Sequence, residues 1–162
     1  MNKELMGKRV KDLTTGIKGV VSSCTMVVSG REQYVIEYTD TKGNPQKYYA
    51  DEHKLKVLSK TSVLKFIEPE DTSHISFGDT VKNVFTGVKG VVFGRVVYIN
   101  GCTNIGFEPK SKDEIKAESG FWYDYRLLKV IKSKRIELPV NAKTKTGGIA
   151  DDFQKSIKQN TM

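Results

Sequence analysis

The chain has 162 residues, 38% of them apolar, and carries a formal net charge of +8. This length suits one ordinary domain or two small ones, and the apolar content excludes a wholly disordered protein. Residues 132–162 hold seven basic and three acidic residues, so half of the net charge lies there. A basic face on the rest of the chain must therefore come from how its charged residues are arranged in space. No run approaches the roughly 20 apolar residues of a membrane span, and the charged start MNKELMGKRVKDL lacks the core of a signal peptide. We therefore expect a soluble, intracellular protein without membrane contact.

The first predicted domain covers residues 1–58. It contains four or five short strands, rich in β-branched and aromatic residues, and a dense turn signal, TDTKGNP, precedes the fourth strand. The loop DLTTGIKG supplies Gly16 where a positive φ is needed and Gly19 where the next strand begins. Short antiparallel strands at this spacing predict a small closed barrel or a strongly bent sheet, either of which removes exposed strand edges.

Residues 59–77 link this domain to the next. Val63, Leu64, Phe66 and Ile67 make the segment too apolar for a free tether. We expect part of it to pack as a strand or between the barrels, and EPEDTSH to form a loop.

The second predicted domain, residues 78–131, repeats the first. VKNVFTGVKGVV at 81–92 matches VKDLTTGIKGVV at 10–21 with an offset of 71, so Gly87 and Gly90 correspond to Gly16 and Gly19. The offset becomes 73 near the end of each half, where LKVL at 55–58 matches LKVI at 128–131. The chain is therefore an internal duplication, and we expect an all-β fold of two tandem small barrels. Each barrel would bury only roughly 60% of its unfolded surface, so docking to the other barrel or to a partner is expected.

Residues 132–162 are predicted to form an extended, basic C-terminal arm. A spacer, NAKTKTGG, precedes a short predicted helix in which Asp151 is the N-cap and Phe153 and Ile157 share one face. Two apolar residues cannot hold such a helix in water, so the arm either frays or docks on a neighbour through Phe153 and Ile157.

Catalytic and metal-binding patterns are missing from the sequence. Cys24 and Cys102 occupy non-equivalent positions without a CxxC motif, and the chain has only two histidines, so no metal site is expected. Whether the two cysteines form a disulfide stays open. His53 and His74 have no repeated counterpart and no nucleophile motif nearby, and no phosphate-binding glycine loop occurs. We expect neither catalysis nor a cofactor.

Two stretches carry a resemblance to known proteins. GKRVKDLTTGIKGVV and GDTVKNVFTGVKGVV look like the opening hairpin of SH3-like barrels of the KOW and Tudor type. Residues 78–131 are also similar to small uncharacterised proteins of tailed bacteriophages, through V-K-D, T-G, G-V, Y-L-x-G-C, P-K, W-x-D and L-x-V patterns. Residues 7–58 match less well, because they lack the Gly-Cys and Pro-Lys pairs. The resemblance implies an SH3-like fold and a phage origin, and it brings no established activity.

Three binding functions compete. The first is a structural or accessory role in a phage virion (head, neck or tail), in which barrel edges and the arm dock onto other viral structural proteins, with homo-oligomerisation left open. The chain would then be found in the virion, or in the host cytoplasm before assembly. We rank this role first because charge is nearly balanced within each barrel.

The second function is nucleic-acid binding through a surface of basic and aromatic side chains. Lys18 and Lys89 are also explained as charged edge positions that block strand addition, and Trp122 is also explained as a buried anchor. The candidate residues of this second function are Lys18, Lys89, Arg95 and Arg126 for phosphates and Tyr98, Phe121, Trp122 and Tyr123 for stacking.

The third function is sequestration of a small nucleotide by the loop NGCTNIGFEPK, with Lys110 as the basic contact.

Overall fold

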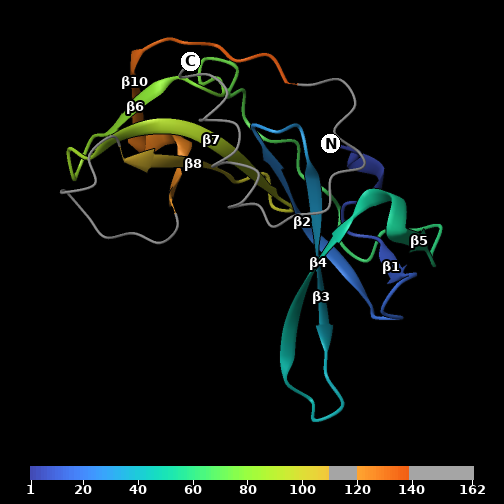
Figure 1. Cartoon of the computed structure of the whole chain (residues 1–162). Helices are drawn as coiled ribbons and strands as arrows, with labels where there is room; N and C mark the ends of the chain where they lie inside the picture. Colours follow the sequence, from blue (N-terminus) through green and yellow to red (C-terminus); the bar gives the residue numbers. More distant parts are fainter. Residues whose placement is uncertain (110–119, 139–162) are drawn as a thin grey trace. The chain divides into compact units, whose positions relative to one another are not determined.

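The computed structural model describes residues 1–109 and 120–138, and the fold is all-β, as predicted (Figure 1). Over these residues the chain divides into two compact units. Unit 1 holds residues 1–25, 32–70 and 97–102, and unit 2 holds residues 26–31, 71–96 and those from 103 onward. The helices in the described ranges are single 3₁₀ turns, and none is long and apolar enough to cross a membrane.

In the sheet of unit 1, strands β1 to β4 follow one another in chain order and β5 lies beside β1, which gives the strand order β5-β1-β2-β3-β4. Strand β1 pairs with both β2 and β5, so the first and last strands of the repeat lie side by side. A 3₁₀ turn joins β4 to β5, and another precedes β1. The elements are η1 (Lys3–Leu5), β1 (Arg9–Asp12), β2 (Lys18–Val27), β3 (Glu32–Thr39), β4 (Pro45–Asp51), η2 (Glu52–Lys54) and β5 (Leu55–Val57).

Unit 2 repeats this topology with the strand order β10-β6-β7-β8-β9. In neither unit is the sheet closed: among the described pairings, β4 pairs only with β3 and β9 pairs only with β8. The two closed barrels expected from the sequence are therefore not confirmed. The elements are β6 (Thr80–Asn83), β7 (Lys89–Tyr98), β8 (Thr103–Pro109), β9 (Phe121–Asp124), η3 (Tyr125–Leu127) and β10 (Leu128–Lys132).

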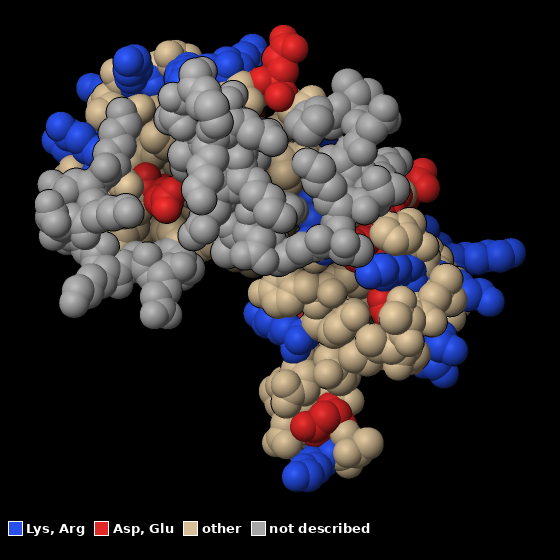
Figure 2. Space-filling view, in the orientation of Figure 1, with Lys and Arg blue, Asp and Glu red and all other residues tan. Residues whose placement is uncertain are grey.

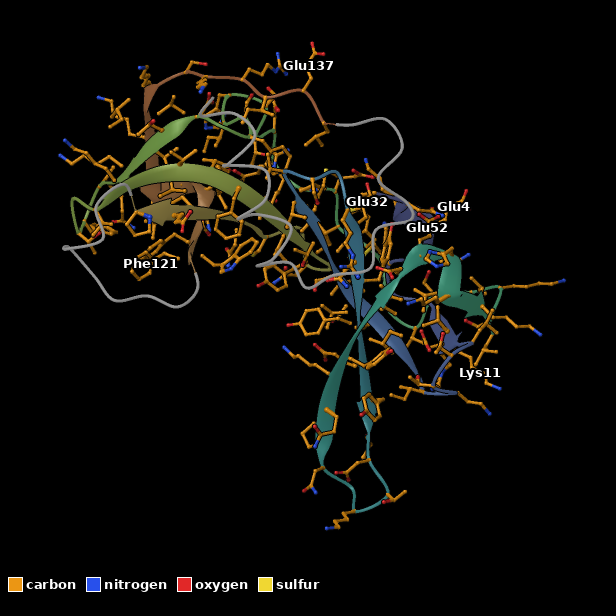
Figure 3. The ribbon with its side chains drawn as sticks, in the orientation of Figure 1. Glu4, Lys11, Glu32, Glu52, Phe121 and Glu137 are labelled. Carbon is orange, nitrogen blue, oxygen red and sulfur yellow. The ribbon has the colours of Figure 1, made fainter. Side chains whose placement is uncertain are left out.

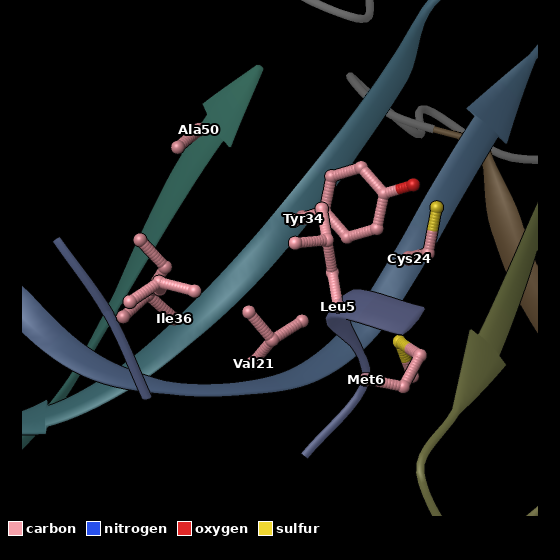
Figure 4. Close-up of a cluster of buried hydrophobic side chains, with 8 residues drawn as sticks. Leu5, Met6, Val21, Cys24, Tyr34, Ile36 and Ala50 are labelled. Carbon is pink, nitrogen blue, oxygen red and sulfur yellow. The ribbon is translucent and has the colours of Figure 1, made fainter. Parts of the chain in front are cut away.

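Equivalent positions of the two repeats build the two cores. Because alternate residues of a strand point to one face, the apolar residues of β1, β2 and β3 meet on the inner side of the sheet. In unit 1 this cluster includes Val10, Val21, Tyr34, Ile36 and Ala50 (Figure 4). In unit 2 the matching positions hold Val81, Val92, Ile105 and Phe107.

Gly16 and Gly87 have the positive φ predicted for them, and Gly19 and Gly90 lie at the predicted strand starts, as the second residues of β2 and β7. Gly16 and Gly87 have φ values of +77° and +74°, a conformation that disfavours side chains with a Cβ. Gly19 and Gly90 lie where two strands approach closely. A Cβ at Gly19 would be 2.3 Å from the carbonyl oxygen of Glu37, and one at Gly90 would be 2.2 Å from that of Glu108.

Each unit includes the hairpin end of the other repeat. In unit 1, the Ile99 N–H donates to the Ser22 carbonyl at 2.8 Å, and the Ile99 side chain packs against the core cluster. In unit 2, the Val28 N–H donates to the Phe93 carbonyl at 2.8 Å, and the two side chains pack together. The compact units therefore differ from the sequence repeats at residues 26–31 and 97–102.

The segments that follow β5 and β10 also correspond. In unit 1, the Leu64 carbonyl oxygen would lie 2.1 Å from a Cβ at Gly7, and in unit 2 the Lys134 oxygen would lie 2.3 Å from a Cβ at Gly78. Gly7 and Gly78 both have positive φ, so a backbone segment crosses at the same place in each unit. Part of the predicted linker is thus an ordered component of unit 1.

Candidate functional site

Each unit carries a row of three lysines on three adjacent strands. In unit 1, Lys11 of β1 lies opposite Lys18 of β2 on one side and Lys56 of β5 on the other. In unit 2, Lys82 of β6 lies opposite Lys89 of β7 and Lys129 of β10. We call these sets the unit 1 lysine row (Lys56, Lys11, Lys18) and the unit 2 lysine row (Lys129, Lys82, Lys89).

The rows point away from the cores. The neighbours of Lys11 along β1, Val10 and Asp12, are fully buried, and side chains alternate between the faces of a strand. The same holds in unit 2, where Lys82 stands between buried Val81 and Asn83. Lysines at the outer positions of both rows are exposed, and the central ones are half-buried. Each row therefore presents its charges on the outer surface of the sheet.

The lysine rows lack acidic partners among the described residues. Residues directly opposite on neighbouring strands have Cβ atoms about 5 Å apart, and like charges in such pairs are destabilising. The ion pairs found in the described ranges involve other groups, such as Lys47 with Glu37 and Lys54 with Asp51. Unneutralised charge that disfavours folding and recurs in both units is expected of a surface that binds an anion.

Further basic residues lie near each row. Arg9 lies two residues before Lys11 on β1, and therefore on the same face of that strand. In unit 2, exposed Lys132 of β10 pairs with Thr80 beyond a register shift in the β6–β10 pairing. In the space-filling view, basic side chains gather over β1 and β5 and, separately, over β6 and β10 (Figure 2). Lys11 is labelled in Figure 3, where it extends from the end of unit 1 that carries the β1–β2 loop.

A tight loop follows β1 and β6, and the last residue of each strand orders the backbone of that loop. In unit 1, Asp12 Oδ1 accepts hydrogen bonds from the Thr14 and Thr15 N–H groups at 2.9 and 2.7 Å. In unit 2, Asn83 Oδ1 accepts from the Phe85 and Thr86 N–H groups at 2.9 and 3.0 Å. These side chains satisfy backbone donors that the turn would otherwise leave free, so both loops have the same conformation.

The structure places two of the predicted phosphate-binding residues in the rows and gives two others different contacts. Lys18 and Lys89 begin β2 and β7 and belong to the rows. Arg95 is partly buried, and its guanidinium donates to the carbonyl oxygens of Thr72 and Ile75 at 3.2 and 2.7 Å. Burial lowers the pKa of Arg95, with Asp71 acting in the opposite direction.

Arg126 pairs with Asp124, the residue before η3. Arg126 Nε and Nη2 donate to the Asp124 carboxylate at 2.9 and 2.7 Å. These side-chain hydrogen bonds hold the pKa of Asp124 below its usual value. Arg126 is therefore engaged within the chain.

The predicted stacking residues mostly pack within unit 2. Trp122 makes an edge-to-face contact with Phe93, with ring centroids 5.3 Å apart. It also covers Gly94 and Gly106, where an added Cβ would lie within 3.0 Å of the indole. Phe121, labelled in Figure 3, and Tyr123 pack against Phe107. Tyr98, at the end of β7, is half-buried and belongs to unit 1.

Several predicted features lie outside the described residues. They are Lys110, the helix beginning at Asp151, and the docking residues Phe153 and Ile157. Within the described ranges, no three His, Cys, Asp or Glu side chains are grouped to hold a metal ion. Cys24 is buried and Cys102 is exposed, and both are free thiols.

The sequence reasoning missed Lys11, Lys56, Lys82 and Lys129 as site residues. Lys11 and Lys82 recur at the repeat offset, and so do Lys56 and Lys129. That recurrence is the available signal, because glycines and core valines have structural reasons to recur, whereas lysines on the outer face of a sheet do not. Their alignment in rows depends on the pairing of β1 with β5 and of β6 with β10, which joins residues about 45 positions apart.

Comparisons with protein-family models, with curated proteins and with solved structures find no match for this chain.

Proposed function

We propose that this protein is a non-catalytic nucleic-acid-binding protein whose two lysine rows contact phosphate groups. The observation that carries the proposal is the repetition of three exposed or half-exposed lysines, without acidic partners among the described residues, at the same place in both units. The nearly balanced overall charge of each repeat does not oppose it, because arrangement, and not the total, determines local potential.

Phosphate is the ligand chemistry that fits these rows. Neighbouring strands lie about 4.8 Å apart, so a row of three spans roughly 10 Å of the sheet surface. A polymer with regularly spaced negative charges can follow such a row, and lysine acts on each phosphate as a flexible point charge. Contacts of this kind do not distinguish sequences, so we expect binding that depends on salt more than on base composition.

The direct test measures binding of a fluorescent single-stranded oligonucleotide by anisotropy at several salt concentrations. The comparison is between the wild type and two triple variants, one with Gln at Lys82, Lys89 and Lys129 and one with Gln at Lys11, Lys18 and Lys56. A matched control with Gln at the exposed residues Lys42, Lys65 and Lys134 loses the same charge outside the rows.

Each row variant should weaken binding and lower the slope of log K against log salt by about 2, since each phosphate contact contributes roughly 0.7 for single strands. The control should change the slope much less. Equal losses in all three variants, or wild-type binding without salt dependence, would refute the proposal.

A virion docking role remains a second candidate. Exposed apolar residues follow one another at the end of β5 and in the segment after it: Val57, Leu58, Val63, Leu64 and Ile67. Such a run suits contact with another protein. The resemblance to phage proteins and the strand order, in which β1 pairs with both β2 and β5, support an SH3-like origin for each unit. Mass spectrometry of purified particles tests this role, and absence of the chain from mature particles would refute it.

A further inference from the structure

The loop beside the unit 2 lysine row carries an exposed aromatic residue. Phe85 is 80% exposed, and it lies in the short connection between Lys82 of β6 and Lys89 of β7. Single exposed apolar residues are common on protein surfaces and usually need no explanation. Phe85 differs because its loop begins and ends next to lysines that face each other across the two strands.

The backbone that carries Phe85 is held in place. Its N–H donates to Asn83 Oδ1, and the Gly87 N–H donates to the Asn83 carbonyl oxygen at 2.9 Å. Asn83 itself is buried, so the turn is anchored to the core of unit 2. A ring presented by an ordered turn loses little freedom when it binds a ligand, because only its own two torsions need to be fixed.

The equivalent loop of unit 1 has the same hydrogen bonds and no aromatic residue. Its Asx turn is formed by Asp12, and Thr14 occupies the position of Phe85 at the repeat offset of 71. Leu13, which precedes it, is 60% exposed. The two units therefore share a basic row and a loop conformation but differ in whether the loop that joins two strands of the row carries a flat ring.

We propose that Phe85 stacks on an unpaired base and that the ligand of unit 2 is single-stranded nucleic acid. This inference rests on the proposed function. Lysine contacts to phosphate serve a single strand and a duplex alike, whereas the base faces of a duplex are covered by neighbouring base pairs. A ring on the loop that joins two strands of a phosphate-binding row adds affinity only where a base is free to lie on it. Unit 1, with Thr14 at this position, contacts the backbone alone.

The test compares single-stranded and duplex DNA of equal length as ligands of the full chain. Phe85→Ala should weaken single-strand binding by about 5- to 140-fold, the range expected for loss of one stacked base. It should leave duplex binding and both salt slopes unchanged, because no phosphate contact is removed. Phe85→Trp should keep or improve single-strand binding. Leu13→Ala, which trims an exposed apolar side chain on the equivalent loop, serves as the matched control and should have little effect.

The outcomes separate this inference from the function on which it rests. Stacking is refuted if Phe85→Ala weakens binding of duplex and single-stranded DNA equally, or if it weakens binding of neither. Phosphate binding still stands in that case, provided that the row variants lose salt-dependent binding. If the wild type binds neither nucleic acid but binds polyglutamate, the ligand is an acidic protein and both proposals fail. A circular dichroism melt of each variant confirms folding, which substitution of so exposed a side chain should not disturb.

Discussion

Lys82 and Lys89 lie directly opposite each other on the antiparallel strands β6 and β7, with no acidic partner for either among the described residues. Lys11 and Lys18 repeat this relationship in unit 1. Two positive charges in such a pair repel, so the pairing costs free energy in the folded state unless an anion is bound. This cost gives the lysine rows a measurable signature even without a ligand.

Replacing the central lysine of a row by an acid should stabilise the protein. Lys82→Glu converts two repulsive cross-strand pairs into attractive ones and should raise the free energy of unfolding by about 0.5–1 kcal/mol at low salt. Urea denaturation with and without added salt measures this effect, which screening should reduce. The control Lys65→Glu, an exposed position outside the strands, should change stability little. A destabilised Lys82→Glu variant would contradict the repulsion argument.

The close strand approach at Gly19 predicts a large effect of a single methyl group. Gly19→Ala places a Cβ against the Glu37 carbonyl oxygen and should cost about 2–3 kcal/mol of stability. Gly16→Ala meets nothing nearer than the Lys11 Cε, at 4.0 Å, and should cost only the strain of a positive φ, about 1 kcal/mol. Equilibrium unfolding of the two variants checks the order, and a smaller loss at Gly19 than at Gly16 would contradict the close approach.

The duplication supplies its own control for the Asx turn of unit 1. Asp12 Oδ1 accepts from two backbone N–H groups and from the Thr15 hydroxyl at 3.0 Å. Asp12→Asn should be tolerated, because Asn83 forms the same turn in unit 2. Asp12→Ala leaves those donors without an acceptor and should cost about 1–3 kcal/mol in thermal or urea unfolding. Equal losses in both variants would show that the carboxylate charge matters more than the turn.

The two cysteines should differ in reactivity. Burial raises the pKa of the Cys24 thiol from 9.0 to about 12, with the charge of Glu32 acting in the same direction, whereas Cys102 is exposed. Only the thiolate is nucleophilic, so iodoacetamide should modify Cys102 quickly and Cys24 only upon unfolding. Mass spectrometry of the native and the urea-denatured protein distinguishes the two sites.

The same pKa shift predicts a loss of stability in alkali. An unfolded chain releases the Cys24 proton near pH 9, while the folded chain keeps it until about pH 12. The stabilisation is therefore complete below pH 9 and is lost progressively as the pH rises toward 12. Cys24→Ala should flatten the dependence of unfolding free energy on pH in this range. An unchanged pH profile would mean that Cys24 does not carry this effect.

Local patterns in the sequence account for the strands and the tight turns. Alternating apolar residues around Val10 and the glycines of the first loop define the β1–β2 hairpin, and the duplication transfers the prediction to β6 and β7. Sheet closure could not be decided in the same way, because it depends on a pairing of β4 with β5 that no local signal encodes. The sequence also does not predict that the hairpin ends at 26–31 and 97–102 pack in the unit of the other repeat, since the unit in which a turn packs is a property of tertiary structure.

Only part of the candidate site could be predicted from the sequence. The sequence indicates Lys18 and Lys89 as candidates, because a core or a turn does not require a lysine at those positions. Three other candidates, Arg95, Arg126 and Trp122, have side chains suited to binding phosphates or bases. Arg95 and Trp122 contact residues that are distant in sequence, and Arg126 pairs with a residue close to it in a turn that was not predicted. Composition identifies residues capable of binding, whereas only the fold tells which of them remain accessible.

Residues 26–31 belong to unit 2 and residues 97–102 to unit 1, so neither sequence repeat alone supplies all the residues of one compact unit. Each half of the chain therefore needs the other half to complete its fold. Halves expressed separately from 1–70 and 71–162 should accordingly reassemble when mixed.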